Sequence, residues 1–349
     1  MPVAAVVMTG ASLASCERFF EQEDDCDPHL YLQFVFDRNM YYNDDYMVGA
    51  DAFAAQVSSV DVYVFNPKTG SFITHLAEKG EPLRQPGYRM PLDLPAGEYE
   101  FIAWCGLADN EGDFTVPQYV QSSSELKCLM NRKKDSDGTA YSDRNLHDLY
   151  HGSVTHTFPD TEGEHTATVN LTKDTNHIQL ALQHYAGPLN PEEFEIKITD
   201  ANGYLGSNNA VLEDETIEYR PWGQRFGIVD MSRANDDNWY YDEEEENKRE
   251  DTNYLVSEFT TSRLMADRNP IFTVYDKVAG EMVFSIPLVK YILMMKSERY
   301  SRLQDQEYLD REDEYDFMVI LENRDKEGWF GVQIVINGWH VVNNGNVGL

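Results

Sequence analysis

Hydrophobic and polar residues alternate in short runs along most of the chain. Valine occupies every second position in residues 60–64, and "LPAGEYEFIAW" (94–104) is a turn followed by a run in which Tyr99, Phe101 and Ala103 share one face. The same period of two recurs at 167–171, 178–182, 194–198, 317–321 and 332–336. This period is that of a strand with one buried face. Many short strands separated by turns predict all-β, antiparallel sandwiches rather than a parallel α/β sheet.

A weak internal repeat divides this pattern in two. "LYLQFVFDRNM" precedes "VSSVDVYVFNPKTGSF" in the first half, and "NHIQLALQHY" precedes "EEFEIKITDANGYL" in the second. Each pair is an apolar strand, a connection, and a strand that ends in a polar turn. A chain of 349 residues is also long for one domain. We therefore expect two tandem sandwich domains, 28–172 and 173–349, with the strand region 166–182 running through both.

Helix is a minor part of the pattern, and the best candidate is the segment 288–303. Leu288, Ile292, Met295 and Arg299 follow the helical period, and basic residues lie toward the C-terminal end, where the helix dipole favours them. We expect one short helix here, with its apolar stripe covering a sheet.

The N-terminus carries an apolar run at residues 3–8, followed by Leu13-Ala14-Ser15-Cys16. This order predicts a signal peptide over 1–15, cleavage before Cys16, a lipid on that cysteine, and a linker over 16–27. No Lys or Arg precedes the apolar run, which favours a translation start upstream of Met1. The alternative is a frayed apolar terminus with a chance thiol at Cys16.

Three further cysteines remain, Cys26, Cys105 and Cys128. An odd number fits one pair and one single thiol. Cys105 ends a strand-like run and Cys128 follows in a later loop or short helix, so they are the favoured pair for a disulfide in an oxidising compartment. The alternative is two reduced, buried thiols.

The formal net charge of −33 limits the partners of this surface. Such a surface repels phosphates and anionic lipid heads, so we expect no nucleic-acid partner. No stretch after residue 16 approaches the ~20 apolar residues of a membrane helix. Any membrane attachment is therefore expected at the N-terminus.

Motifs for metal, cofactor or catalytic chemistry are weak. "HDLYH" places His147 and His151 four apart, but Asp stands where zinc proteases have Glu, and Gly152 follows at once. There is no Gly-rich phosphate loop and no Gly-x-Ser-x-Gly elbow. The acidic run 234–253 lacks the residue order of a calcium loop and reads as a solvated loop. We expect no metal, no cofactor and no enzymatic activity.

Several motifs follow one another along the chain: Cys16, Cys26, "LQFVFDRNM", "DAFAAQVSSVDVYVFNPKTGSF", "LPAGEYEFIAWCGL", "DLYHG", "LTKDTNHIQLAL", "QEYLDREDEYDF" and "VINGWHVV". In this order they resemble the fimbrial anchor lipoproteins of Bacteroidetes, the FimB-type family that accompanies type V fimbriae. The resemblance spans nearly the whole chain, with insertions at 41–50 and 234–253. It implies transthyretin-like sandwiches, a lipid on Cys16 and a place at the base of a fimbria on the outer membrane. The carboxylates of "ERFFEQEDD" after Cys16 fit export to the cell surface.

Two functions follow from this resemblance. The first is a lipid-anchored subunit that attaches the base of a fimbria to the outer membrane and ends its assembly, with shaft pilins as partners. The alternative is a fimbrial tip adhesin or glycan-binding lipoprotein of the same fold, for which Trp222, Trp239, Tyr240 and Tyr241 are the loop aromatics.

The family also implies a role for the first strand. In related shaft pilins, a protease removes this strand after an Arg, and the open groove accepts a strand from a neighbour by β-augmentation. Here the matching strand is 31–36, with Leu32, Phe34 and Phe36 on one face, and the cut would follow Arg38. Cleavage would remove strand and lipid together, so we expect an anchored molecule to retain the strand. A strand donated to the neighbour would come from 335–342.

Overall fold

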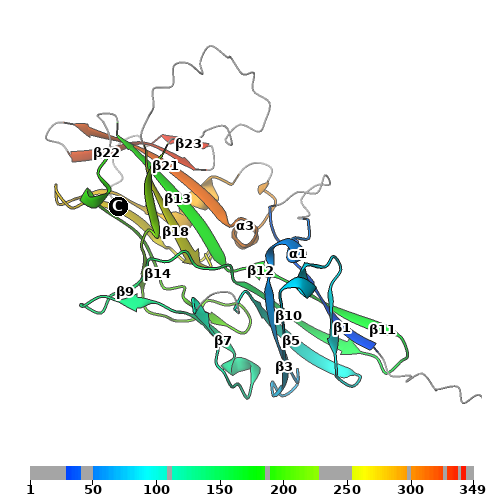
Figure 1. Cartoon of the computed structure of the whole chain (residues 1–349). Helices are drawn as coiled ribbons and strands as arrows, with labels where there is room; N and C mark the ends of the chain where they lie inside the picture. The colour runs from blue at the N-terminus through cyan, green and yellow to red at the C-terminus, as the bar shows by residue number, and fades with distance from the viewer. Residues whose placement is uncertain are drawn as a thin grey trace, which may run out of the picture.

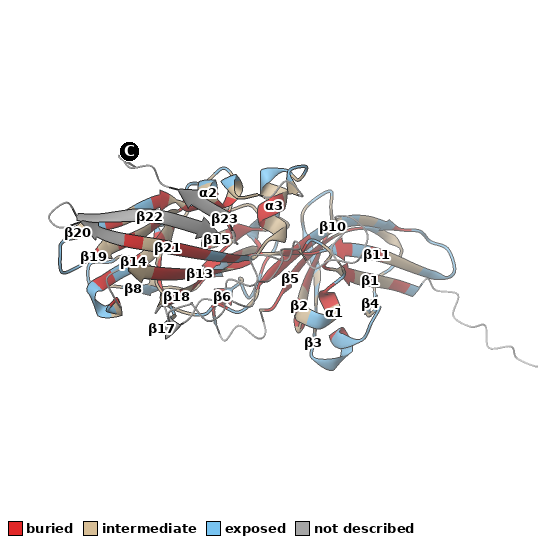
Figure 2. Cartoon of the chain, turned by 90° about the horizontal axis from the view of Figure 1, so that it is seen from above, coloured by how far each residue is buried: buried red, intermediate tan, exposed pale blue. Residues whose placement is uncertain are grey.

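The structure is a computed structural model that describes residues 29–40, 50–107, 112–184, 189–227, 254–296, 300–324, 328–336 and 339–342. Over these ranges the chain is mainly β, as the alternation predicts, and its strands form five sheets. The sheets gather in two lobes that lie end to end (Figures 1 and 2). The predicted signal peptide, Cys16, Cys26, the insertion at 41–49 and the acidic run 234–253 lie outside the described residues.

The first lobe is a sandwich of two sheets. A three-stranded sheet has the order β11 (Glu164–Asn170), β1 (His29–Val35), β4 (Arg89–Leu92). A five-stranded sheet has the order β12 (Thr172–Lys173), β10 (Tyr150–Phe158), β5 (Gly97–Cys105), β2 (Ser59–Phe65), β3 (Phe72–Lys79). The valines at 60, 62 and 64 meet the apolar face of β1 in one buried cluster, which the short α1 (Phe53–Gln56) and η1 (Glu81–Arg84) help to close.

The second lobe contains two six-stranded sheets. The first has the order β17 (Gly223–Gly227), β18 (Tyr254–Ser262), β13 (Thr175–His184), β21 (Glu314–Arg324), β22 (Gly328–Ile336), β23 (Trp339–Val342). The second has the order β20 (Glu281–Pro287), β19 (Ile271–Asp276), β14 (Phe194–Asp200), β16 (Ile217–Tyr219), β9 (Ala140–Ser142), β8 (Lys133–Lys134). Phe272 of β19 and Phe317 of β21 meet edge to face, with ring centroids 5.7 Å apart, so the core lies between the sheets.

One segment of the first half of the chain completes the second lobe. β7 (Lys127–Met130) joins β6 (Phe114–Thr115) and β15 (Tyr204–Gly206) in a small sheet, with η2 (Ser123–Glu125) before it. β9 pairs with β16. Strands before residue 172 are thus hydrogen-bonded to strands after it, a connection that the sequence pattern does not reveal. The division of the chain at 172 stays a prediction.

Consecutive strands run from one lobe into the other near that point. β11, β12 and β13 follow each other almost without interruption, yet each belongs to a different sheet. At the first break the amide of Leu171 donates to the carbonyl of Val35, and at the second the amide of Asp174 donates to that of Leu149. Both breaks are therefore fixed by backbone hydrogen bonds to neighbouring elements of the first lobe.

Most strand pairs are antiparallel, but three are parallel. They are β1 with β11, β13 with β21, and β9 with β16. Alternation within a strand does not specify the direction of its neighbour, which in these cases depends on connections that run through several other strands.

The predicted helix over 288–303 is shorter than expected. α2 comprises Leu288–Met294, and its buried residues Leu288, Val289 and Ile292 pack in the core of the second lobe, as the apolar stripe predicts. Lys296 then donates through Nζ to the carbonyl of Leu303 at 2.7 Å, so the chain turns before a second helix, α3 (Asp305–Arg311). η3 (Pro191–Glu193) is the remaining helical turn that the structure describes. Among the described helices, none has the length and apolar character needed to cross a membrane.

Candidate functional site

Strand β1 occupies the middle of the three-stranded sheet. It pairs in parallel with β11, placing Leu32 opposite Ala167, and antiparallel with β4, placing the same residue opposite Met90. The predicted apolar face is buried: Leu32 is fully covered, and Phe34 and Phe36 are each 2% exposed. Leu30 extends the same face. The first strand therefore fills its own groove and bonds to a neighbour on both sides.

Aromatic contacts hold this face against the opposite sheet. Phe34 stacks on Phe53 of α1 with ring centroids 5.4 Å apart. Phe36 meets Tyr150 of β10 edge to face at 5.1 Å. Removing β1 would expose both partner rings. The lobe would therefore lose the stability that these aromatic contacts contribute as well as that of the main-chain hydrogen bonds.

The residues after β1 are tied down individually. Asn39 is buried and donates through Nδ2 to the carbonyls of Phe36 at 2.7 Å and Ala50 at 2.9 Å. Asp51 Oδ1 accepts from the amides of Phe36 and Phe53. Arg38, the residue after which cleavage would occur, is exposed. The peptide bond between Arg38 and Asn39 therefore joins an exposed residue to one whose side chain is fixed in the folded lobe.

The residues just after β1 contact the opposite sheet of the sandwich and the second lobe. Arg38 Nη1 donates to Thr172 Oγ1 of β12 at 3.4 Å. Arg311 Nη1 of α3 donates to the backbone carbonyl of Asp37 at 3.2 Å. The first strand is therefore linked to the helix of the second lobe.

Ion pairs surround this meeting point. Lys173 Nζ lies 2.9 Å from Asp148 and 2.5 Å from Asp313, and His177 lies 3.4 Å from the same Asp148. Burial works against charge on both groups, yet His177 and Lys173 hold the pKa of Asp148 below its usual range, and the two carboxylates raise that of Lys173. Both groups stay charged, and the bridge joins β12 to the residues that come just before β10 and β21.

A second buried group lies one residue further on. Asp174 is fully buried, accepts from Asn209 Nδ2 at 2.9 Å, and lies 3.6 Å from Arg263. Burial raises the pKa of Asp174 to about 7, and the nearby Arg263 opposes that rise. Arg263 in turn pairs with Asp310 of α3 at 2.7 Å.

The structure does not contain the Cys105–Cys128 disulfide that the sequence favoured. Both cysteines are free and buried. Cys105 belongs to the core of the first lobe, whereas Cys128 belongs to the core cluster that also includes Trp104. Because Trp104 and Cys105 are consecutive on β5, their side chains point to opposite faces, and Cys128 meets the face that Cys105 does not occupy. Burial raises the pKa of both thiols.

His147 and His151 do not share a helical face, because Tyr150–Phe158 is strand β10. His147 Nδ1 lies 2.8 Å from buried Asp113, while His151 is buried, contacts Trp104 edge to face, and bonds to the carbonyl of Ser207. No group of three His, Cys, Asp or Glu in the described ranges could hold a metal ion.

The predicted donor region and loop aromatics fall in different places. Residues 335–342 cover the end of β22 and all of β23, which is the edge strand of its sheet and pairs with β22. Trp222 is 37% exposed. Trp239, Tyr240 and Tyr241 lie outside the described residues.

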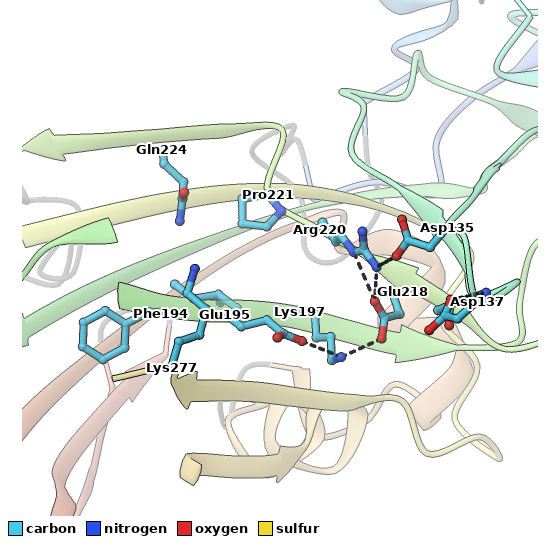
Figure 3. Close-up of a pocket in the computed structure, with 12 residues that line it drawn as sticks. Asp135, Asp137, Phe194, Glu195, Lys197, Glu218, Arg220, Pro221, Gln224 and Lys277 are labelled. Atoms are coloured by element: carbon cyan, nitrogen blue, oxygen red, sulfur yellow. Dashed lines mark hydrogen bonds and ion pairs between the residues drawn. The ribbon is translucent and has the colours of Figure 1, made fainter. Parts of the chain in front are cut away.

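The second lobe has a polar cleft that the sequence patterns do not predict (Figure 3). It has a volume of about 480 Å³ and is lined by Asp135, Asp137, Thr139, Phe194, Glu195, Ile196, Lys197, Glu218, Arg220, Pro221, Gln224 and Lys277. Its residues come from β14, β16, β17, the β8–β9 and β16–β17 connections and the turn after β19, which are far apart in the sequence. The alternation of polar residues on the outer face of β14 was the available signal, but it does not distinguish a cleft from an ordinary solvated face.

Ion pairs form a continuous row inside this cleft. Lys197 Nζ lies 2.7 Å from Glu195 and 2.6 Å from Glu218, and Arg220 Nη2 lies 2.7 Å from Asp135. Arg220 Nε also donates to Glu218 at 3.1 Å. Burial favours the neutral form of Glu218, yet Lys197 and Arg220 outweigh it and lower its pKa.

A family of known proteins matches most of the chain. A family model described as fimbrillin-A associated anchor proteins Mfa1 and Mfa2 matches residues 23–345. No curated protein sequence matches the chain.

Solved structures provide further similarity. A candidate adhesin of Bacteroides thetaiotaomicron is 32% identical, with a TM-score of 0.72 over 91% of this chain and 99% of its own. A candidate polysaccharide-binding protein of the same organism is 29% identical, with the same coverage and TM-score. The fimbrial anchor protein Mfa2 of Porphyromonas gingivalis is 18% identical, with a TM-score of 0.63 over 91% of this chain and 99% of its own, a likeness of fold.

Proposed function

The chain belongs to the family of fimbrillin-A associated anchor proteins Mfa1 and Mfa2, and from this premise we propose that it is a lipid-anchored subunit at the base of a fimbria that ends assembly there. Membership in this family implies that the protein is associated with fimbriae at the cell surface. The finer claims, a lipid on Cys16 in the outer membrane, contact with shaft pilins by strand exchange, and termination, are the proposal. The role is structural and needs no catalytic group.

The observation that supports this role most strongly is the occupied groove of β1. Leu32, Phe34 and Phe36 are buried, and β1 lies between two neighbouring strands. Burying each such side chain contributes ~1.5–3 kcal/mol, so emptying the groove would cost several kcal/mol. A molecule whose groove holds its own strand has no place for a strand from a neighbour.

The order along the chain explains why this strand would be kept. Cys16 precedes β1, and Arg38 follows it. A cut after Arg38 would release strand and lipid together, so the anchored form requires the uncut chain. Such a subunit can donate a strand but cannot accept one, and chain growth ends at it.

The donated strand is proposed to come from residues 335–342. β23 is the edge strand of its sheet, and within the described residues β22 is the strand with which it pairs. An edge strand exchanges more readily than a central one, because it leaves only one ladder of hydrogen bonds.

Replacing Cys16 with Ser in the producing cells tests the anchoring. The variant should appear in the medium or periplasm rather than in the outer membrane, and deletion of the gene should give longer, shed fimbriae. Replacing Cys26 with Ser is the matched control and should leave the protein in the membrane. A Cys16→Ser variant that partitions into detergent as the wild type does would refute the lipid anchor.

A tip adhesin remains the alternative role, favoured by the relative described as a candidate adhesin. The two roles predict opposite ends of the fimbria. Immunogold labelling of intact cells should place this protein where the fimbria meets the membrane, and labelling at the free end would favour the adhesin.

A further inference from the structure

The polar cleft on the second lobe has the features of a binding site that the anchor role does not use. Its volume of about 480 Å³ falls within the range of small-ligand sites. We propose that this cleft binds a neutral carbohydrate. This inference does not rest on the anchoring role, because strands of the second lobe line the cleft and β1 belongs to the first lobe.

The polar side chains of the cleft are held in place before any ligand arrives. The row Glu195, Lys197, Glu218, Arg220 and Asp135 alternates in charge, and each inner member has a partner on both sides. The Arg220 guanidinium also lies 4.1 Å from the ring centroid of Tyr141. Side chains fixed in this way lose little conformational entropy when a ligand binds, which favours affinity.

The charge balance points to a neutral ligand. Four carboxylates and three cationic groups line the cleft, and Lys197 and Arg220 are each shared between two carboxylates. The cleft has little excess charge with which to recruit a free ion, and the chain as a whole carries a formal charge of −33. A polyanion would be repelled at a distance.

Hydrogen-bonding capacity remains after the ion pairs are formed. A carboxylate has about four acceptor positions and a guanidinium five donors, so the row presents acceptors and donors in alternation. A hydroxyl group both donates and accepts. Neighbouring hydroxyls of a sugar ring match this alternation, and uncharged Gln224 and Thr139 add further groups of both kinds.

The cleft has a smaller apolar part. Phe194 and Ile196 line it but are buried in the core at 5% and 4% exposure, so they form its floor. Pro221 is only half-buried and lies beside Arg220 in Figure 3. The ring of Pro221 can therefore contact a C–H face of a sugar while the polar row bonds to its hydroxyls.

Native gels that contain a polysaccharide test this site with the full chain. Starch, yeast mannan, xylan and arabinogalactan are the neutral probes, and alginate is the anionic one. We expect at least one neutral probe to slow the wild type and alginate to have no effect. Lys277→Met and Gln224→Leu should each weaken binding about 5-fold to 10-fold, the effect of one lost hydrogen bond. Both residues are exposed, so the variants should fold.

Lys68→Met is the matched control, because Lys68 is an exposed lysine of the first lobe that pairs with Glu98 across 3.4 Å. It should bind as the wild type does. Arg220→Lys should keep the positive charge but lose the planar fork, and weaken binding as well. Failure of all four neutral probes to slow the wild type would overturn the proposal. So would retardation by alginate, or neutral binding that the cleft variants leave unchanged.

Discussion

Arg311 of α3 donates a hydrogen bond to the backbone carbonyl of Asp37, two residues after the end of β1, across 274 positions of sequence. The same guanidinium pairs with Glu307 one turn earlier in the helix, at 3.0 Å. The strand that carries the proposed lipid-bearing terminus is therefore fixed both by its own lobe and by a helix of the other. Stability of β1 and contact between the lobes are expected to change together.

Replacing Arg311 with Met tests this link. The loss of a largely covered hydrogen bond from a charged donor should lower the free energy of unfolding by about 1.5–3 kcal/mol and speed hydrogen exchange of β1 amides. Glu307→Gln is the control, because it removes the helical ion pair, worth about 0.3–0.5 kcal/mol, and keeps the bond to Asp37. Unchanged exchange in β1 for Arg311→Met would show that the helix does not hold the strand.

The apolar face of β1 should dominate the stability of the first lobe. Phe34→Ala should lower the free energy of unfolding by about 3–5 kcal/mol, because it removes a buried ring that stacks on Phe53. Gln33→Ala, on the other face of the same strand, should cost less than about 1 kcal/mol. Urea denaturation of both variants measures the difference, and equal losses would mean that the groove of β1 contributes little.

The two thiols should be inaccessible in the folded protein. Cys105 and Cys128 are buried, and burial raises the pKa of each, so the reactive thiolate is scarce. Iodoacetamide should leave both unmodified in the native state and modify both in urea without a reductant. A Cys105–Cys128 linked peptide in a non-reduced digest would show instead that the bridge forms.

Asp174 should make stability depend on pH. The folded state raises its pKa from 3.8 to about 7, so between these values the folded chain binds more protons than the unfolded chain. Its contribution is then fully present below about pH 3.8 and is lost as the pH rises through 7. His151 acts in the opposite sense, because burial lowers its pKa to about 4 and its contribution is lost as the pH falls from 6.5.

Asp174→Asn separates these effects, since it keeps the shape and cannot ionise. The free energy of unfolding of the variant relative to the wild type should increase from pH 4 to pH 7.5. The neighbouring groups Asn209, Arg263 and Asp310 remain in both proteins. A difference that is constant over this interval would mean that Asp174 is already ionised throughout.

Local pattern predicted the strands well and their pairing poorly. The alternation at 178–182 and 194–198 identifies the buried residues of β13 and β14, because one covered face leaves a period of two in the sequence. The parallel neighbour of β1 is not predictable in this way, since β11 begins more than a hundred residues later. α3 was missed because Tyr308 and Leu309 are its only buried residues and give no apolar stripe.

The candidate sites differ in the same respect. The buried face of β1 follows from Leu32, Phe34 and Phe36 alone, whereas the cleft joins residues of β14 and β16 to the connection between β8 and β9. Cys105 and Cys128 looked like a pair, but the pattern did not show that the Cys105 side chain points from one face of β5 whereas Cys128 belongs to the core cluster on the other face. Packing between residues far apart in the sequence determines the cleft and the placement of the two cysteines, and the alternation of residues within one strand does not predict that packing.

The central claim is that the anchored molecule keeps its first strand. Mass spectrometry of the mature protein, isolated from outer membranes of cells that assemble fimbriae, tests it most directly. The account predicts one uncleaved N-terminal segment over residues 16–38, with a lipid on Cys16 and the bond between Arg38 and Asn39 intact. A mature N-terminus at Asn39 would contradict it, because that molecule would have lost both β1 and its anchor.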